Sequence, residues 1–216
     1  MASSEWRQHL GLVRSRQEDA WRASDYHGCW VIADGMGGHA AGDVAAEVAA
    51  QTAFASVLCS RDGSLGSVAA HAALAAHRAV LRESSGRRKG LGSTLAMLLV
   101  RNGEGVICHT GDSRIYRFSP DGLMTQMTTD HATPTGHLIR ALGHAGGDAP
   151  EVRQVDPQQG SLWLLCSDGL TRAVSDRDIA TILGSRDTLA SKADGLIHKA
   201  LDAGGPDNVT AILVRP

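Results

Sequence analysis

The apolar residues of this chain fall into short continuous runs, separated by polar segments that often contain glycine. The run CWVIA at 29–33 is rich in β-branched side chains and ends at DGMGG, which predicts a buried strand. Similar runs predict further strands, at 9–13, 94–100, 105–109, 114–118, 123–127, 152–155, 162–166 and 208–214. Asn102-Gly103 and Asp121-Gly122 favour hairpin turns between neighbouring runs. The middle of the chain therefore predicts an antiparallel meander, which 152–155 and 162–166 continue.

Segments with helical periodicity flank these strands. Residues 40–58 and 65–83, both rich in alanine, predict two helices before the meander, and 175–183 and 188–203 predict two more after it. Helices, a block of antiparallel strands, more helices and a closing strand make an α+β domain whose helices cover its sheets. The length of 216 residues suits one domain, and no repeat or linker divides it, so we expect a single domain over 1–216.

Composition and charge argue against several classes of partner. The formal net charge is −2, which gives no reason to expect binding to nucleic acid or to an anionic membrane. No apolar stretch approaches the roughly 20 residues that span a bilayer, and the N-terminal segment lacks the features of a signal peptide. The 4 cysteines form no CxxC pair, which favours free buried thiols, so we expect a cytoplasmic protein.

Aspartates occur in loop-like settings along almost the whole chain, at Asp19, Asp34, Asp112, Asp168 and Asp207. All but Asp19 have a glycine close by in the sequence, and most adjoin an apolar run. A carboxylate at the end of a buried strand is costly to desolvate unless a positive charge meets it. Brought together, these side chains would make an oxygen-ligand site for hard divalent cations. The alternative is that each Asp-Gly pair is an ordinary capped turn.

The order of the motifs is more specific than any one of them. From about residue 9 to residue 214 the chain contains, in order, RSRQEDA, VIADGMGGHAAG, GSTLAMLL, HTGDSRIYRF, TTDHA, LLCSDGLT and GGPDNVTAILV. In this set it resembles the metal-dependent protein phosphatases, the type 2C serine/threonine family, in their bacterial form. The resemblance implies a four-layer α-β-β-α sandwich of two antiparallel sheets flanked by helices. It also implies hydrolysis of phosphoserine and phosphothreonine in proteins by a hydroxide that bridges two manganese or magnesium ions.

The resemblance assigns metal ligands by position. Asp34 would bridge the two ions, and the carbonyl of Gly35 would be a further ligand. Asp168 and Asp207 would complete the coordination of one of the ions. Two cations about 3.5–4 Å apart lower the pKa of a shared water, which agrees with this choice of residues.

Three further acids complete the implied ligand set. Glu18 would be a ligand on the side of the other ion, and Asp19 would act there through water. Asp112 in GDSR matches the residue that, with Asp168, holds a third and weaker metal ion in bacterial members.

The resemblance also implies residues that handle the phosphate and the proton. Arg14 lies four positions before Glu18 and matches the arginine that clamps the substrate phosphate, a role that suits the planar fork of a guanidinium. Arg16 is the competing candidate. His39 follows DGMGG and has the pKa range to protonate the departing serine or threonine oxygen. The alternative is a solvent-facing histidine at a helix start. His131 in TTDHA has a structural precedent in the family.

One segment departs from the family pattern. Bacterial members carry a flap of a few dozen residues between the DH motif and an RALG segment, whereas here residues 131–143 connect the two almost directly. The flap is thus largely absent, and we expect an open site. Two other functions stay open: a phosphatase-fold module that binds or senses without turnover, and a hydrolase of small phosphate esters. The implied partners are phosphoproteins and a cognate serine/threonine kinase, and we expect a monomer.

Overall fold

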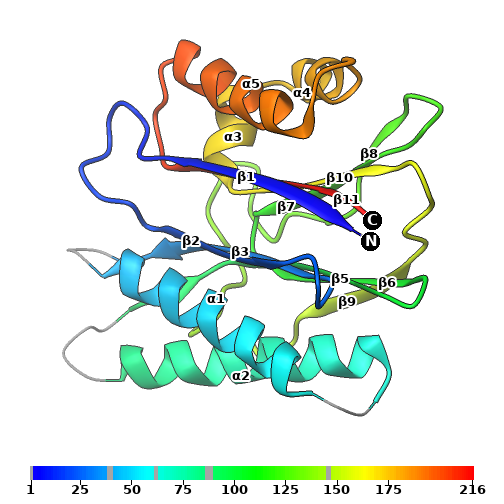
Figure 1. The fold of residues 1–216 in the computed structure, drawn as a ribbon. Helices are drawn as coiled ribbons and strands as arrows, with labels where there is room; N and C mark the ends of the chain where they lie inside the picture. The colour runs from blue at the N-terminus through cyan, green and yellow to red at the C-terminus, as the bar shows by residue number, and fades with distance from the viewer. Residues whose placement is uncertain (1, 38–40, 61–62, 86–89, 145–146) are drawn as a thin grey trace.

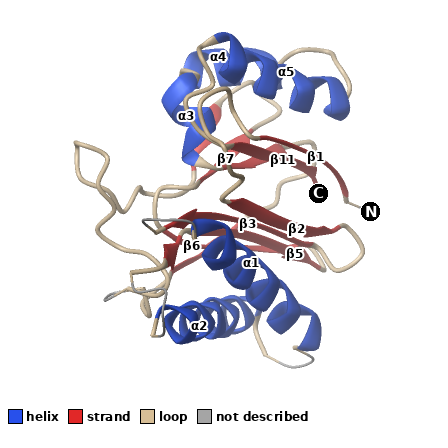
Figure 2. Ribbon diagram, turned by 90° about the vertical axis from the view of Figure 1, so that its left-hand side faces the viewer, coloured by secondary structure: helices blue, strands red, loops and turns tan. Residues whose placement is uncertain are grey.

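The computed structural model describes residues 2–37, 41–60, 63–85, 90–144 and 147–216. Two antiparallel sheets lie face to face, and helices cover the outer face of each (Figure 1). The predicted α+β class and the four-layer sandwich are therefore confirmed. The two chain ends lie side by side (Figures 1 and 2), because the first and last strands pair with each other.

The first sheet joins strands from both ends of the chain to a hairpin from its middle. Its strands, in spatial order, are β1 (Ser3–His9), β11 (Val209–Arg215), β10 (Leu162–Cys166), β7 (Arg114–Phe118) and β8 (Met124–Gln126). Its outer face is covered by α3 (Asp168–Ala173), α4 (Asp176–Leu183) and α5 (Leu189–Asp202).

The second sheet comes mainly from the first half of the chain. Its strands are β2 (Asp19–Ser24), β3 (Cys29–Met36), β5 (Leu95–Arg101), β6 (Glu104–Thr110) and β9 (Glu151–Val155), with the short β4 (Gly92–Ser93) paired to β3. Its outer face is covered by α1 (Gly42–Cys59) and α2 (Leu65–Ser84).

Alternate side chains of the central strands enter different cores. On β3, Val31 and Ala33 pack toward α1 and α2, while Trp30 and Ile32 pack between the two sheets. Trp163 of β10 reaches the same central layer from the opposite sheet, and both tryptophans are fully buried. Because both faces of these strands are covered, their residues are apolar without alternation, which explains the continuous runs in the sequence.

The two helices over the second sheet pack through small side chains. The buried residues of α1 are Gly42, Ala45, Ala46, Ala49, Ala50, Ala53 and Val57. Alanine favours the helical backbone and lets a helix approach its neighbours closely, so one residue type serves both propensity and packing. The four predicted helices are confirmed to within a few residues of their ends.

The N-terminal part of the second sheet and the first strand differ from the prediction. The predicted strand at 9–13 is wrong, because β1 ends at His9 and Leu12 and Val13 are 64% and 70% exposed in the following loop. Pairing with β11 decides this boundary, since His9 is opposite Val209, the first residue of that strand. Sequence reasoning also missed β2, whose few apolar residues give a weak strand signal on their own.

The predicted meander is wrong at the step between β6 and β7. β5 pairs with β6 and β7 pairs with β8, as the two hairpin turns predict. However, β6 and β7 belong to different sheets, so the chain crosses the sandwich between them, at the segment that contains Asp112. In the same way β9 joins β6 while β10 joins β7. Turn signals specify pairs of strands, and distant contacts decide how the pairs assemble.

The cysteines are free thiols, as expected, but the expectation that they are buried is wrong for one of the four. Cys29, Cys108 and Cys166 are buried, and Cys59 is exposed. Burial raises the pKa of each buried thiol to about 12, which leaves these cysteines unreactive. Among the described residues, no helix is both long and apolar enough to cross a bilayer.

Candidate active site

One pocket of about 280 Å³ gathers most of the residues that the sequence singled out. Those in its lining are Arg14, Glu18, Asp34, Gly35, Asp112, Asp168 and Asp207. Asp19 is buried beside them, in register with Asp34 on the neighbouring strand. His39 lies outside the described residues. Both sheets contribute, because the sequence-distant acids sit at strand ends or connections that meet here.

Strand pairing fixes Asp34 on both sides. It is opposite Asp19 of β2, and its N–H donates to the hydroxyl of Thr94 at 2.9 Å. The N–H of Thr94 donates in turn to the Asp34 carbonyl at 2.8 Å. The loop-like setting predicted for Asp34 is therefore wrong, because β3 continues beyond it. Gly35 is needed for a close approach, since a Cβ there would lie 1.9 Å from the Gly42 carbonyl oxygen at the start of α1.

The adjacent acids Glu18 and Asp19 have different surroundings. The Glu18 side chain lines the pocket. The Asp19 carboxylate lies behind the pocket and accepts hydrogen bonds from Ser167 Oγ at 2.7 Å and Thr210 Oγ1 at 2.6 Å. Glu18 is thus free to act on a ligand directly, whereas Asp19 is tied to hydroxyl groups of the other sheet.

Asp168 and Asp207 are brought into one wall by a backbone contact. Asp168 is the first residue of α3, with Ser167 at the N-cap, so its predicted loop-like setting is also wrong. Asp207 lies two residues before Val209, the first residue of β11. A Cβ at Gly169 would lie 1.9 Å from the carbonyl oxygen of Asn208, so glycine allows the start of α3 to touch this segment.

Asn208 holds the loop that contains the acidic pair. Its side-chain amide donates to the carbonyls of Leu10 and Arg16 at 2.8 and 2.9 Å. Its Oδ1 accepts from the N–H of Glu18 at 2.7 Å. Sequence reasoning did not assign Asn208 a role, because its partners lie almost a full chain length away.

Asp112 lies on the connection that crosses between the sheets. Two residues further on, Arg114 binds the carboxylate of Asp130. Its Nε donates to Oδ1 at 2.9 Å and to Oδ2 at 3.0 Å, and its Nη2 donates to Oδ2 at 2.6 Å. This bidentate pair ties the crossing segment to the TTDHA motif and so holds Asp112 at the pocket wall.

Two guanidiniums enter the acidic pocket. Arg14 Nη2 lies 2.8 Å from Asp207 Oδ2, and Arg14 Nη1 lies 3.9 Å from Glu18 Oε2. Arg172 Nη2 lies 2.6 Å from Asp168 Oδ2. Sequence reasoning missed Arg172, because residues four apart face each other only on a helix and α3 was not predicted.

The buried acids repel one another. Burial is the main cause that raises the pKa of Asp34 well above its usual range, and the charges of Asp19 and Asp168 raise it further. Burial also raises the pKa of Asp19 to about 7, against the hydrogen bonds from Thr210 and Ser167. The pKa of Asp168 rises to about 6, mainly through burial and then through Asp112. The ionised form of these acids is therefore unfavourable unless a cation is bound.

The short segment after TTDHA still reaches the pocket. Ala132 and Leu138 form a bridge, and the N–H of Thr133 donates to the His137 carbonyl at 2.8 Å, which folds 132–138 into a small loop. Gly136, His137 and Leu138 line the pocket. Sequence reasoning missed His137, because no motif contains it.

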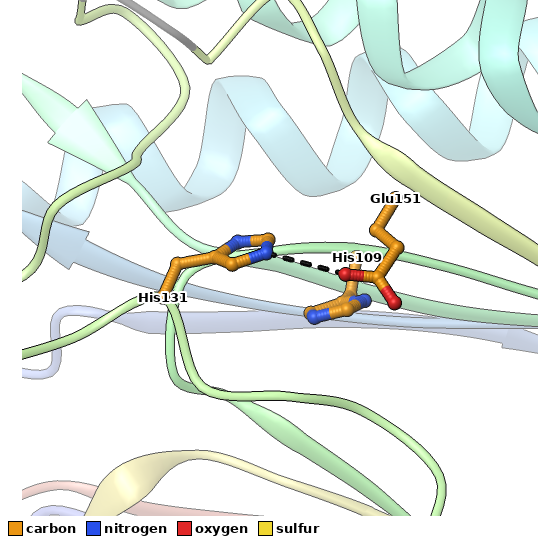
Figure 3. A group of neighbouring side chains, drawn as sticks. All are labelled: His109, His131 and Glu151. Atoms are coloured by element: carbon orange, nitrogen blue, oxygen red, sulfur yellow. Dashed lines mark ion pairs between the residues drawn. The ribbon is translucent and has the colours of Figure 1, made fainter.

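A second cluster, His109, His131 and Glu151, was also not predicted (Figure 3). The two rings stack with centroids 4.7 Å apart, and His131 Nε2 lies 3.5 Å from Glu151. His109 Nε2 donates to the Thr129 carbonyl at 2.9 Å, while His131 Nδ1 accepts from the Gly111 N–H at 3.2 Å.

These contacts favour a structural cluster over a metal site. Because His131 Nδ1 is an acceptor, the proton of the neutral ring is on Nε2, the nitrogen that faces Glu151. A metal ion there would move that proton to Nδ1, where it would meet the N–H of Gly111. Burial lowers the pKa of His131 and so favours the neutral ring. The cluster instead joins the motifs HTGDSR and TTDHA.

The donor set of the pocket fits hard divalent cations. Among the described residues, its lining carries carboxylates at Glu18, Asp34, Asp112, Asp168 and Asp207 and guanidiniums at Arg14 and Arg172. The excess of negative charge, the raised pKa values and the absence of thiolates from this lining are what Mn²⁺ or Mg²⁺ would complement.

Comparison with known proteins shows which family the chain belongs to. The family model of protein phosphatase 2C matches residues 13–202. The serine/threonine phosphatase stp of Listeria innocua is 33% identical over 240 aligned positions, which cover 98% of this chain and 95% of that protein. Because those positions outnumber the 216 residues here, the Listeria protein carries residues without a counterpart in this chain.

A Mycobacterium tuberculosis protein is related in both sequence and structure. The serine/threonine protein phosphatase PstP is 36% identical over 235 positions, covering 96% of this chain and 43% of PstP. The solved catalytic domain of PstP in complex with two manganese ions has a TM-score of 0.90 and 34% identity, covering 99% of this chain and 97% of that one. The chain belongs to the protein phosphatase 2C family of serine/threonine phosphatases.

Proposed function

We propose that this protein hydrolyses phosphoserine and phosphothreonine in proteins with the help of two Mn²⁺ or Mg²⁺ ions. The observation that carries the proposal is the convergence of Glu18, Asp34, Asp168 and Asp207 in one pocket that also contains Arg14. The manganese-bound structural relative supports the choice of ion. When bound, two such cations lower the pKa of a shared water, so that hydroxide is available near neutral pH.

The proposed ligand roles are those that the family resemblance implies. Asp34, on β3, is proposed to bridge the two ions, with the carbonyl of Gly35 beside it. Asp168 and Asp207, which share one wall, would hold one ion.

Glu18 would hold the other ion directly. Asp19 would act on it through water, because its Oδ2 is already engaged by two hydroxyl groups.

The test of this function is phosphate release from a phosphothreonine peptide with manganese and with a chelator. Activity that persists in the chelator would refute the two-ion proposal. The same assay with p-nitrophenyl phosphate separates the protein phosphatase from a hydrolase of small phosphate esters. A module that only binds phosphoproteins would release no phosphate in either assay.

Arg14 is proposed to bind the phosphate group of the substrate. Its side chain is 47% exposed, and its guanidinium is positioned at the pocket by Asp207 and Glu18. We expect Arg14→Ala to lower kcat/KM for a phosphothreonine peptide roughly 10- to 100-fold, because charge-assisted hydrogen bonds to the phosphate are lost. Arg16→Ala is the matched control, since this arginine is exposed and absent from the pocket lining. Equal losses in the two variants would remove the phosphate-binding role from Arg14.

His39 is proposed to protonate the departing serine or threonine oxygen. A poor leaving group needs this proton, whereas p-nitrophenolate leaves without it. We expect His39→Asn to lower kcat about 10²-fold on the phosphothreonine peptide and far less on p-nitrophenyl phosphate. His137→Asn is the comparison, because His137 lines the pocket. If the substrate-dependent loss appears in His137→Asn instead, then His137 is the donor and the assignment to His39 is wrong.

The remaining features of the proposal concern the setting of the enzyme. We propose a single catalytic domain whose flap is reduced to the short loop within 131–143, which gives an open site for phosphoproteins. A cognate serine/threonine kinase, a monomeric state and a cytoplasmic location stay predictions from the sequence.

A further inference from the structure

Arg172 contacts two carboxylates, those of Asp168 and Asp112. Asp112 has no role in the two-ion proposal. Arg172 Nη2 is 2.6 Å from Asp168 Oδ2 and 3.6 Å from Asp112 Oδ2. Its Nη1 is 4.0 Å from Asp207 Oδ2. The guanidinium therefore lies between Asp112 and Asp168, the pair at which the family resemblance implies a third metal ion.

The local fold makes this placement specific. Asp168 is the first residue of α3, and Arg172 is one helical turn later on the same face. Asp112 comes from the connection between the two sheets, so the arginine joins segments that only the tertiary structure brings together. A simple ion pair within one helix would not involve Asp112.

The chemistry of the group suits this position. A guanidinium keeps its charge at every relevant pH and offers several donors in a rigid plane, so it can face two carboxylates at once. A divalent ion bound to the same two carboxylates would meet the positive charge of Arg172 at close range.

We propose that Arg172 is a built-in cation that competes with a third metal ion for the Asp112–Asp168 pair. This inference rests on the proposed function, because the other carboxylates must hold the first two ions. The Arg172 side chain is 49% exposed, so it has room to turn toward solvent and admit the third ion when the metal concentration is high. The protein thereby works as a two-ion enzyme at moderate manganese concentrations.

The test is the number and strength of manganese sites, measured by calorimetry and by equilibrium dialysis. For the wild type we expect two strong sites and a third that is much weaker. Arg172→Gln should tighten the third site at least about tenfold and leave the first two within a few-fold. Arg172→Lys, which keeps the charge, should keep the third site weak. Arg177→Gln, at an exposed arginine of α4, is the matched control and should behave as the wild type.

A double variant locates the gained site. Asp112→Asn combined with Arg172→Gln should lose the tightened third site, because one of its two carboxylates is gone. An unchanged third site in Arg172→Gln, with the first two sites intact, would overturn the competition while leaving the proposed function standing. A wild type without two strong manganese sites would overturn both. Circular dichroism spectra that match the wild type confirm that each variant is folded.

Discussion

Replacing Asp34 with asparagine is expected to lower manganese-dependent phosphate release from a phosphothreonine peptide by at least about a thousandfold, or roughly 4 kcal/mol of transition-state stabilisation. Asp34 lines the pocket and is held there by strand pairing next to Asp19 and by the hydrogen bonds with Thr94. Asparagine has nearly the same shape, so the strand is preserved while the bridging negative charge is removed.

The stability of this variant separates a metal ligand from a structural residue. Because burial and the neighbouring acids raise the pKa of Asp34, its charge is unfavourable in the metal-free fold. The metal-free Asp34→Asn protein should therefore be at least as stable as the metal-free wild type. Manganese should stabilise the variant much less than the wild type, which thermal unfolding with and without the ion measures.

Two further variants and a control complete this experiment. Asp168→Asn and Asp207→Asn should also lose turnover and keep the fold. Asp202→Asn, at an exposed position at the end of α5, should keep both activity and manganese stabilisation. If Asp34→Asn unfolds the protein, the residue has a structural role; if it retains activity, the two-ion proposal fails.

The metal-free protein is expected to lose stability as the pH rises from about 4 to about 7. The folded-state pKa is about 7 for Asp19 and about 6 for Asp168, both raised from 3.8. Between the unfolded and folded pKa values the folded state binds more protons than the unfolded state, so the free energy of unfolding falls with rising pH. Above the folded pKa values the full penalty is present, roughly 7 kcal/mol for the two groups together.

Manganese should cancel this loss. Metal ions bind the deprotonated carboxylates, so their stabilisation grows over the same pH range. The measurement is the melting temperature between pH 5 and pH 7.5, with saturating manganese and with a chelator. We expect a fall with the chelator and a flat or rising curve with the ion. A metal-free melting temperature that rises over this range would contradict the assigned pKa shifts, and Asp19→Asn should flatten the fall.

Much of the site was predictable because its motifs are local. Asp34-Gly35, Asp168-Gly169 and the acid before β11 each stand beside an apolar run, and the pocket does bring them together. The glycines beside Asp34 and Asp168 have a physical reason, since each allows a backbone contact that a side chain would prevent. Acids and glycines beside an apolar run can therefore be recognised from the sequence alone.

Other residues of the site depend on contacts that no local pattern contains. Ser167 and Thr210 bind Asp19 from the opposite sheet, and Asn208 holds the loop before Glu18. Arg172 reaches the site because a helix begins at Asp168 where the sequence predicted a turn. For the same reason the histidine cluster was not predicted, since stacking of His109 on His131 requires the crossing between sheets.

The sequence by itself determined the α+β class, the buried strands, the order of acidic motifs and hence the kind of site. It did so because strands covered on both faces must be apolar along their length, and because carboxylates beside such strands require a positive partner. Only the tertiary structure decided which sheet each strand joins, where β1 ends and which cations face Asp112 and Asp168. Those choices rest on pairings between residues far apart in the chain, whose free energy is not encoded in any single segment.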